Sequence, residues 1–372
     1  MKYYVIAGEA SGDLHGSNLL KALKKEDHTA HFRIWGGDLM EAAGGELVKH
    51  YRDLAFMGFV EVVSNIRTIL GNIKFCKEDI LAYQPDALVL IDYPGFNLRI
   101  AKWAKQQGIK VYYYISPQIW AWNSKRVHGI KANVDQMFVI LPFEKPFYDK
   151  YNYEVDFVGH PLLDVVENRA VNTGFRQNNG LDDRPIISLL PGSRRQEIAK
   201  MLSEMLMVVP HFPNHQFVLA GAPSIPLDYY QSILNQYPAA KEVKVIQNKT
   251  YDLLEESSAA LVTSGTATLE TALFGVPEVV CYKGNPISYQ IAKRLVNIQY
   301  ISLVNLILDR PLVKELIQNE LNTSNLVKEL KLLLDENHQK IIQEGYQELR
   351  SKLGNSGASQ RTAQLMVKYL RL

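Results

Sequence analysis

The chain of 372 residues is 47% hydrophobic and 22% charged, proportions that are ordinary for a soluble globular enzyme of two domains. Its net charge of +2, without a long basic run, argues against nucleic-acid binding. Its cysteines, Cys76 and Cys281, lack the C-x-x-C spacing of a zinc ribbon and fit a reducing compartment, and no apolar run reaches the roughly 18 residues of a membrane span.

The first part of the chain alternates apolar runs with helix-like stretches. The run YYVIAG close to the N-terminus predicts a buried strand rather than a signal peptide, and a helix with leucines at helical spacing follows over residues 13–25. Residues 87–92 (ALVLID) form a continuous apolar run, which is typical of a parallel strand covered on both faces. A later helix ends at Gly108, where we expect a left-handed C-cap.

A second series of strands and helices follows a polar segment. Residues 166–185 are rich in Asn and Gly and indicate a linker, after which short apolar runs are separated by helix-length intervals. This pattern predicts an α/β fold of two doubly wound Rossmann-like domains that face each other across a cleft. We place the first domain at residues 1–167 and the second at 168–345, with an amphipathic helix at 346–372 that packs back on the first domain.

The first loop, VIAGEASGDLHG, has glycines outside the G-x-G-x-x-G spacing of a dinucleotide fold. Glu9, Ser11 and Asp13 offer a hydroxyl and hydrogen-bond acceptors around flexible glycines such as Gly12. This set suits a polyhydroxyl or amino-sugar ligand better than a bare phosphate. The alternative is that Ser11 or Asp13 caps the first helix, and the sequence leaves both interpretations open.

Asp92 ends the buried strand of the ALVLID run. A carboxylate at the mouth of an apolar strand gains basicity through desolvation and is well placed to act as a general base. The alternative role is the N-cap of the helix that follows.

Two loops of the second domain indicate a nucleotide diphosphate site. In LLPGSRRQEI, the turn at Gly192 and Ser193 opens a helix beside Arg194, a combination that favours phosphate oxygens; the alternative is a tight turn before a solvated basic helix start. In VTSGTATLE, small residues after a strand allow close backbone approach to a diphosphate: Ser264, Gly265 and Thr266.

Glu270 lies one helical turn after the last of these small residues and is placed to accept hydrogen bonds from ribose hydroxyls. The alternative is a surface glutamate behind an N-cap at Thr266. Neither loop is a Walker A motif. We expect no metal ion and no cofactor.

Residues 56–75 carry an apolar stripe at helical spacing. Such a stripe is usually core, but this stretch has more apolar residues than one core face needs, so a partly exposed patch for lipid is the second interpretation. The candidate lipid contacts are Phe59, Val62, Val63, Ile66 and Ile69. The segment SPQIWAWNSKRV adds two tryptophans beside Lys125 and Arg126, residue types that stack on sugars, lie at a lipid interface or pack in the core.

Seven segments follow one another along the chain: AGEASGD, SPQIWAWNSKRV, LPFEKPFYDKY, VGHP, LLPGSR, SGTATLE and YISLVNLIL. In this order they resemble the motif series of the lipid A disaccharide synthase family, and the resemblance extends from Val5 to about Val367. The resemblance implies a two-domain inverting glycosyltransferase of the B fold that needs no metal, with the acceptor bound by the first domain and the UDP-sugar by the second.

The implied reaction joins UDP-2,3-diacylglucosamine to 2,3-diacylglucosamine 1-phosphate, forming a β-1,6-linked disaccharide and UDP. The resemblance makes Asp92 the candidate base and adds Asn305 to Arg194 and Glu270 at the donor site. It also implies a cytoplasmic protein in peripheral contact with the inner membrane. Arg195 and Gln196 follow PGSR, where the family varies, and a Gly follows Pro94, where we expect an acidic residue in some members.

Two other classes of function stay open. One is a different B-fold sugar-nucleotide enzyme, such as a UDP-N-acetylglucosamine epimerase or the muramyl glycosyltransferase. The acyl-sized apolar patch from Phe59 to Ile73 argues against an epimerase, because an epimerase handles only soluble sugar. The other is a non-catalytic sensor of nucleotide sugars, against which Asp92 beside an intact donor site argues.

Overall fold

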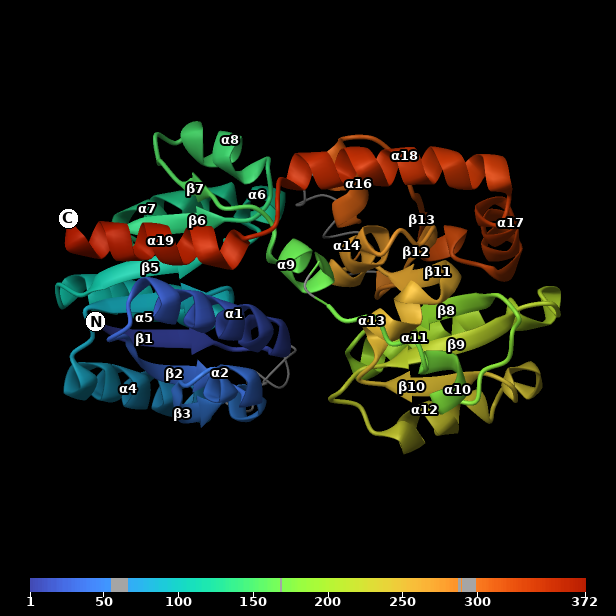
Figure 1. Ribbon diagram of the computed structural model, residues 1–372, viewed down its shortest axis with the longest axis horizontal. Helices are drawn as coiled ribbons and strands as arrows, with labels where there is room; N and C mark the ends of the chain where they lie inside the picture. The colour runs from blue at the N-terminus through green and yellow to red at the C-terminus, as the bar shows by residue number, and fades with distance from the viewer. Residues whose placement is uncertain (55–65, 168, 287–288, 290–298) are drawn as a thin grey trace. The chain divides into compact units, whose positions relative to one another are not determined.

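The computed structural model describes residues 1–54, 66–167, 169–286, 289 and 299–372. The chain divides into two compact units, unit 1 (Met1–Asp164 with Leu353–Leu372) and unit 2 (Val165–Lys352). Each unit is a parallel sheet covered by helices, as the alternation of apolar runs and helical stretches predicts (Figure 1).

The sheet of unit 1 has the strand order β3-β2-β1-β4-β5-β6-β7. Its strands are β1 (Lys2–Ala7), β2 (His31–Gly36), β3 (Glu46–His50), β4 (Ala87–Ile91), β5 (Lys110–Tyr114), β6 (Gln136–Val139) and β7 (Asp156–Phe157). Its helices are α1 (Ala10–Glu26), α2 (Asp38–Ala42), α4 (Ile66–Tyr83), α5 (Pro94–Gln106), α6 (Ile119–Trp122), α7 (Val127–Asn133), α8 (Glu144–Asp149), α9 (Pro161–Glu167, which runs into unit 2) and α19 (Ala358–Arg371).

The sheet of unit 2 has the strand order β10-β9-β8-β11-β12-β13. Its strands are β8 (Ile186–Leu190), β9 (Gln216–Gly221), β10 (Lys244–Gln247), β11 (Ser257–Thr263), β12 (Glu278–Tyr282) and β13 (Lys314–Ile317). Its helices are α10 (Phe175–Asn178), α11 (Arg195–Leu206), α12 (Leu227–Leu234), α13 (Thr250–Glu255), α14 (Thr266–Leu273), α16 (Leu303–Leu308), α17 (Thr323–Leu333) and α18 (Glu336–Leu353).

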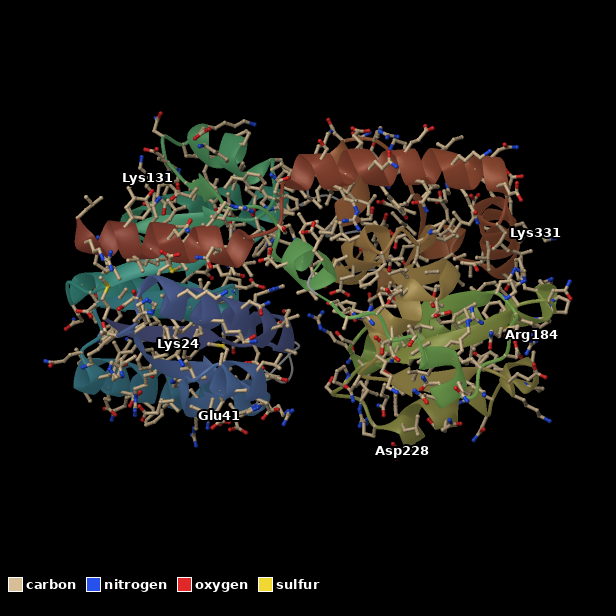
Figure 2. The ribbon with its side chains drawn as sticks, viewed as in Figure 1. Lys24, Glu41, Lys131, Arg184, Asp228 and Lys331 are labelled. Carbon is tan, nitrogen blue, oxygen red and sulfur yellow. The ribbon has the colours of Figure 1, made fainter. Side chains whose placement is uncertain are left out.

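The central strands are buried on both faces, which explains their continuous apolar sequences. In β8, Ile187 and Leu189 belong to one core cluster, whereas Ile186 and Leu190 belong to another. Successive side chains of a strand point to opposite faces, so the two clusters are the cores above and below the sheet. Charged side chains such as Lys24, Glu41 and Lys131 instead lie on the outside of their unit (Figure 2).

Three boundaries bear on the sequence expectations. Gly108 adopts φ +73° directly after the end of α5, which confirms the left-handed C-cap. The segment 166–185 is not a simple linker, because Phe175 is buried in the core of unit 2. The helix expected over 346–372 is wrong, since α18 and α19 are separate and Gly357 between them has φ +95°. Of these two helices, α19 is the one that packs against α1.

None of the helices in the described part of the chain is long and apolar enough to cross a membrane.

Candidate active site

Each sheet has one topological switch point, where the strand order reverses. In unit 1 it lies between β1 and β4, and in unit 2 between β8 and β11. Loops that leave two neighbouring parallel strands in opposite directions open a crevice at the carboxyl edge of the sheet, and ligands of doubly wound folds bind there. The sequence candidates Glu9 and Asp92 follow β1 and β4, and Arg194 and Gly265 follow β8 and β11.

Asp92 is held in an unusual backbone conformation. Asp92 and Tyr93 have φ values of +44° and +50°, a left-handed pair that is costly for residues other than glycine. Three hydrogen bonds fix the Asp92 peptide: its N–H donates to the Tyr114 carbonyl over 3.1 Å, and its carbonyl accepts from Asn97 Nδ2 at 2.8 Å and from the Tyr113 hydroxyl at 2.5 Å.

In this conformation Asp92 is not the residue that caps the helix after it. The N-cap of α5 is Tyr93, so the alternative that Asp92 caps this helix is wrong. Burial, and then the negative charge of Glu9, raise the pKa of Asp92 to about 6. A carboxylate with that pKa is a stronger base than an ordinary aspartate and is still ionised at neutral pH. The geometry and the raised pKa therefore fit the expectation that Asp92 is a general base.

The opening loop is shorter than the sequence indicated, because α1 already begins at Ala10. Glu9 is the N-cap residue, and Ser11 is exposed on the first turn. Gly12 is not a flexible loop residue: it is buried, and a Cβ there would approach the Cβ of Ala7 to 3.1 Å. Gly8 is also a packing glycine, since a Cβ would collide with the ring of Tyr93.

Asp13 has a structural role that the sequence interpretation missed. Its carboxylate is 3% exposed and accepts hydrogen bonds from the backbone N–H groups of Gly37, Leu39 and Met40 at 2.8, 3.1 and 3.0 Å. Asp13 therefore caps the N-terminus of α2. It does not cap the first helix, and its carboxylate is used by the scaffold rather than by a ligand. Of the two acidic residues expected in this loop, Glu9 is the one whose charge raises the pKa of Asp92.

In unit 2, the turn after β8 has the features of an anion site. Gly192 has φ +104°, and a Cβ at this position would come within 2.9 Å of the Glu197 carboxylate, so glycine is required. Ser193 is exposed, and Arg194 is the N-cap residue of the twelve-residue α11. The Arg194 guanidinium is 59% exposed and lies 3.2 Å from Glu197 in a surface ion pair. Such pairs are weak, so the guanidinium is available to a phosphate.

The turn after β11 is also open. Gly265 and Thr266 are exposed, and a Cβ on Gly265 would meet nothing within 4 Å. Gly265 is the N-cap and α14 begins at Thr266, so the proposed N-cap at Thr266 is wrong. The Ser264 hydroxyl donates to the Ile301 carbonyl at 2.8 Å and thereby ties this turn to the loop before α16.

Glu270 lies on the first turns of α14 and receives a hydrogen bond from the Tyr251 hydroxyl at 3.3 Å. Burial raises the pKa of its carboxyl group, although the side chain keeps some exposure. Tyr251 stacks on Phe274, with ring centroids 5.3 Å apart, and so holds Glu270 from the side. Nothing in the sequence around Tyr251 singled it out.

Asn305 does not belong with the exposed donor residues. It is 1% exposed, its Nδ2 donates to the Val313 carbonyl at 2.9 Å and to Glu315 at 3.0 Å, and its Oδ1 accepts from the Val313 N–H at 3.0 Å. All its hydrogen-bonding groups are therefore used to join α16 to β13. The expectation that Asn305 lines the donor site is corrected to a supporting role behind the loop at Ile301.

The lipid candidates fall mostly outside what the structure describes. Phe59, Val62 and Val63 lie outside the described residues, and so does the side chain of Ile66. Ile69 is only partly buried and packs against the core of unit 1, which favours the core interpretation for this position.

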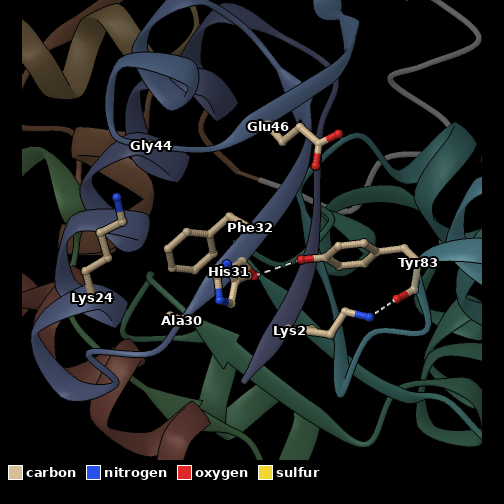
Figure 3. A pocket seen from close by; sticks show the side chains of 8 residues that line it. All are labelled: Lys2, Lys24, Ala30, His31, Phe32, Gly44, Glu46 and Tyr83. Atoms are coloured by element: carbon tan, nitrogen blue, oxygen red, sulfur yellow. Dashed lines mark hydrogen bonds between the residues drawn. The ribbon is translucent and has the colours of Figure 1, made fainter.

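A cavity of about 610 Å³ lies in unit 1 at the amino edge of the sheet (Figure 3). It is lined by residues that begin strands, among them Lys2, His31 and Glu46. Tyr83 closes one side, where its hydroxyl donates to the His31 carbonyl at 3.1 Å and its own carbonyl accepts from the Lys2 amine. The edge that carries Asp92 is the opposite one, so this cavity is not part of the candidate active site.

Comparison with known proteins agrees with this geometry. Residues 3–369 match the Lipid-A-disaccharide synthetase family. The lipid-A-disaccharide synthase of Geobacter metallireducens is 40% identical over 98% of this chain and 96% of its own length, and that of Syntrophus aciditrophicus is 40% identical over 99% and 97%. Among solved structures, a UDP-GlcNAc 2-epimerase from Neisseria meningitidis bound to UDP-GlcNAc superposes with a TM-score of 0.68 at 14% identity, covering 99% of this chain and 100% of that one. The last similarity concerns the fold alone.

Proposed function

Because this chain belongs to the lipid-A-disaccharide synthetase family, we propose that it transfers 2,3-diacylglucosamine from UDP-2,3-diacylglucosamine to 2,3-diacylglucosamine 1-phosphate. The products are the β-1,6-linked disaccharide 1-phosphate and UDP. The observation that carries this proposal is the rigidly held Asp92 at the switch point of unit 1, a base placed to take the proton of an acceptor hydroxyl, which a non-catalytic sensor of nucleotide sugars does not need.

The proposed mechanism is a single displacement. Forming a β linkage from an α-linked UDP-sugar inverts the anomeric carbon, so no covalent sugar–enzyme intermediate is needed. The 6-hydroxyl of the acceptor attacks the anomeric carbon while the Asp92 carboxylate takes its proton, and the bond to the UDP oxygen breaks. Positioned bases of this kind contribute about 10²–10⁴-fold to the rate.

Unit 2 supplies the groups for the leaving UDP in this proposal. The exposed guanidinium of Arg194 and the open turn at Gly265 stabilise the diphosphate as negative charge develops on it. Glu270 accepts hydrogen bonds from the ribose hydroxyls. With these groups in place no divalent metal is required, so activity should persist in excess chelator; its loss with chelator and return with magnesium would contradict this part of the proposal.

We also propose that the protein is cytoplasmic and contacts the inner membrane surface, because both substrates are diacylated. Supporting residues lie on α4, where Leu70 and Leu81 are 54% and 50% exposed. Replacing both by Ser should lower binding to phospholipid vesicles several-fold without unfolding the protein, since neither side chain belongs to the core. Unchanged vesicle binding would place the membrane contact elsewhere.

The reaction itself is tested by incubating the protein with both proposed substrates and following UDP release and the disaccharide product. Omitting the acceptor should abolish UDP release. Release of UDP at the same rate without the acceptor, or conversion of UDP-N-acetylglucosamine to its epimer, would reject the proposed activity.

A further inference from the structure

An exposed aromatic and basic cluster lies at the carboxyl edge of the unit 1 sheet, after β5. It consists of Trp122, from α6, and of Lys125 and Arg126, from the 3-10 turn Ser124–Arg126. Trp122 is 53% exposed, and the guanidinium of Arg126 lies 4.7 Å from the centroid of its ring. Stacking holds the planar guanidinium in one orientation and leaves its N–H groups free to donate.

The segment that carries this cluster is firmly anchored. Ile119 and Val127, on either side of it, are 1% and 0% exposed. Trp120 packs edge-on against Phe143, with ring centroids 4.7 Å apart. The outward direction of Trp122 is therefore set by buried neighbours in the chain and does not reflect a loose surface loop.

The neighbouring loop is anchored in the same way. The carboxylate of Glu144 accepts from the Ile140 and Leu141 N–H groups at 3.1 and 2.9 Å, and the hydroxyls of Ser116 and Tyr148 are 2.6 Å apart. The Glu144 contacts fix the loop that follows β6, and the Ser116–Tyr148 contact joins the loop after β5 to α8. The cluster thus stands on a rigid base at the same edge as Asp92, whose N–H bonds to the last residue of β5, Tyr114.

The charges at this edge of the sheet favour the cluster, rather than the switch point, as the place for a phosphate. Asp92 and Glu9 make the switch point of unit 1 acidic, which disfavours a phosphate dianion beside them. Arg52 is already paired with Asp38 at 2.9 Å. In contrast, Lys125 and Arg126 are exposed and form no ion pair with any residue that the structure describes.

We propose that Lys125 and Arg126, the latter stacked on Trp122, bind the phosphate of the acceptor sugar. The inference rests on the proposed function, because it concerns the 1-phosphate of that acceptor. A phosphate monoester accepts bidentate hydrogen bonds from a guanidinium, and the compact positive charge of an ammonium group attracts it electrostatically. The pair would then select phosphorylated over dephosphorylated acceptor and keep the phosphate apart from the acidic switch point.

The test compares wild type with the double variant Lys125→Gln/Arg126→Gln, using 2,3-diacylglucosamine 1-phosphate and its dephosphorylated form as acceptors. The double variant should show a KM for the phosphorylated acceptor that is higher by about tenfold or more, as expected for lost charge-assisted hydrogen bonds. Its kcat, its KM for the dephosphorylated acceptor and its affinity for UDP should stay unchanged. Arg126→Lys should retain part of the selectivity.

Arg99→Gln is the matched control, because Arg99 is an exposed arginine of the adjacent α5 and has no ion pair among the described residues. Loss of selectivity in this control with retention in the double variant would move the phosphate site to α5 and overturn the proposal. A wild-type protein that transfers to neither acceptor would overturn the proposed function and this inference together. Wild-type transfer with unchanged selectivity in the double variant would overturn the inference alone.

A third measurement distinguishes binding of the acceptor phosphate from binding of anionic lipid. The double variant should bind phosphatidylglycerol vesicles like wild type. If instead it loses vesicle binding while keeping its preference for the phosphorylated acceptor, the cluster serves anionic lipid and the proposal is wrong.

Discussion

The carboxyl edges of the two sheets present their functional groups in different ways. In unit 1, hydrogen bonds from the side chains of Asn97 and Tyr113 to its carbonyl hold Asp92 in a strained conformation, and burial raises the pKa of its carboxyl group. In unit 2, Arg194 and Gly265 stand in exposed turns. The difference fits the two roles that we propose: a base must be placed and have its pKa raised before substrate arrives, whereas a diphosphate brings its own charge and needs donors that are ready to exchange water for phosphate.

The substitution Asp92→Asn tests this difference between the two units most severely. The substitution keeps the shape and the backbone hydrogen bonds but removes the base, so turnover should fall by about 10²–10⁴-fold. UDP affinity, measured by calorimetry, should not change, because the donor groups lie in unit 2. Turnover within about tenfold of wild type would show that the base is another group, with Glu9 the next candidate.

Removing the donor contacts should have a smaller effect. Arg194→Ala and Glu270→Ala should each weaken UDP binding by roughly 1.5–3 kcal/mol, which is about tenfold or more in Kd. Arg195→Ala is the matched control. Its guanidinium lies over the ring of Tyr229, 5.0 Å from the ring centroid, and we assign it no contact with UDP. Calorimetry that finds wild-type affinity in both donor variants would contradict the assignment of unit 2.

The pH dependence sharpens the account of unit 1. Asp92 works as a base only when ionised, so with a pKa of about 6 the kcat/KM should fall as the pH drops below that value. The negative charge of Glu9 contributes to the raised pKa, and Glu9→Gln should therefore move the acid limb to lower pH. Glu41→Gln, on the exposed surface of α2, should leave the profile in place. An acid limb that is unmoved in Glu9→Gln would contradict the coupling.

The smallest effect concerns stability, at a carboxyl group of unit 2 far from any proposed role. Glu278 on β12 is 0% exposed and neither of its oxygens has a hydrogen-bond partner in the described structure. Burial, and then Glu315, raise its pKa well above the ordinary value. Because the pKa is raised only in the folded state, the folded chain loses stability progressively as the pH rises from the ordinary glutamate pKa of about 4.3 toward the raised folded-state pKa.

Glu278→Gln should remove this loss. Its Tm should exceed that of the parent protein at pH 8 by a few degrees, about 2–4 °C for each 1 kcal/mol in a unit of this size, with a smaller difference at pH 4. Glu242→Gln, at a side chain that is 80% exposed, should change neither value. A Tm difference that does not depend on pH would show that ionisation of Glu278 is not the cause.

How far the sequence predicts the fold and the site depends on the range of the forces involved. Alternating apolar runs and helical periodicity were enough for two doubly wound units, because buried parallel strands need continuous apolar sequence. The position of Asp92 at the carboxyl end of β4 was also predictable, since it is the polar residue that ends such a run. Its αL conformation was not, because the bonds from Asn97 and Tyr113 that hold it depend on how the chain folds back.

The errors at other residues have the same origin. Asp13 and Asn305 looked like ligand contacts because each is a polar residue beside a glycine turn or within a recognised motif. Their partners, the N–H groups at Gly37 and the backbone of Val313, come from other elements. A polar side chain in a motif is thus assigned to a ligand or to the scaffold only by the hydrogen bonds that its tertiary neighbours supply.

The division of labour between the units is tested most directly by hydrogen–deuterium exchange of the full chain with and without UDP. The account predicts that UDP protects the amides of residues 192–195 and 264–270 in unit 2, and that the same protection is seen in Asp92→Asn. Absence of protection in these two turns, with protection at residues 8–13 and 92–97 of unit 1 instead, would contradict it.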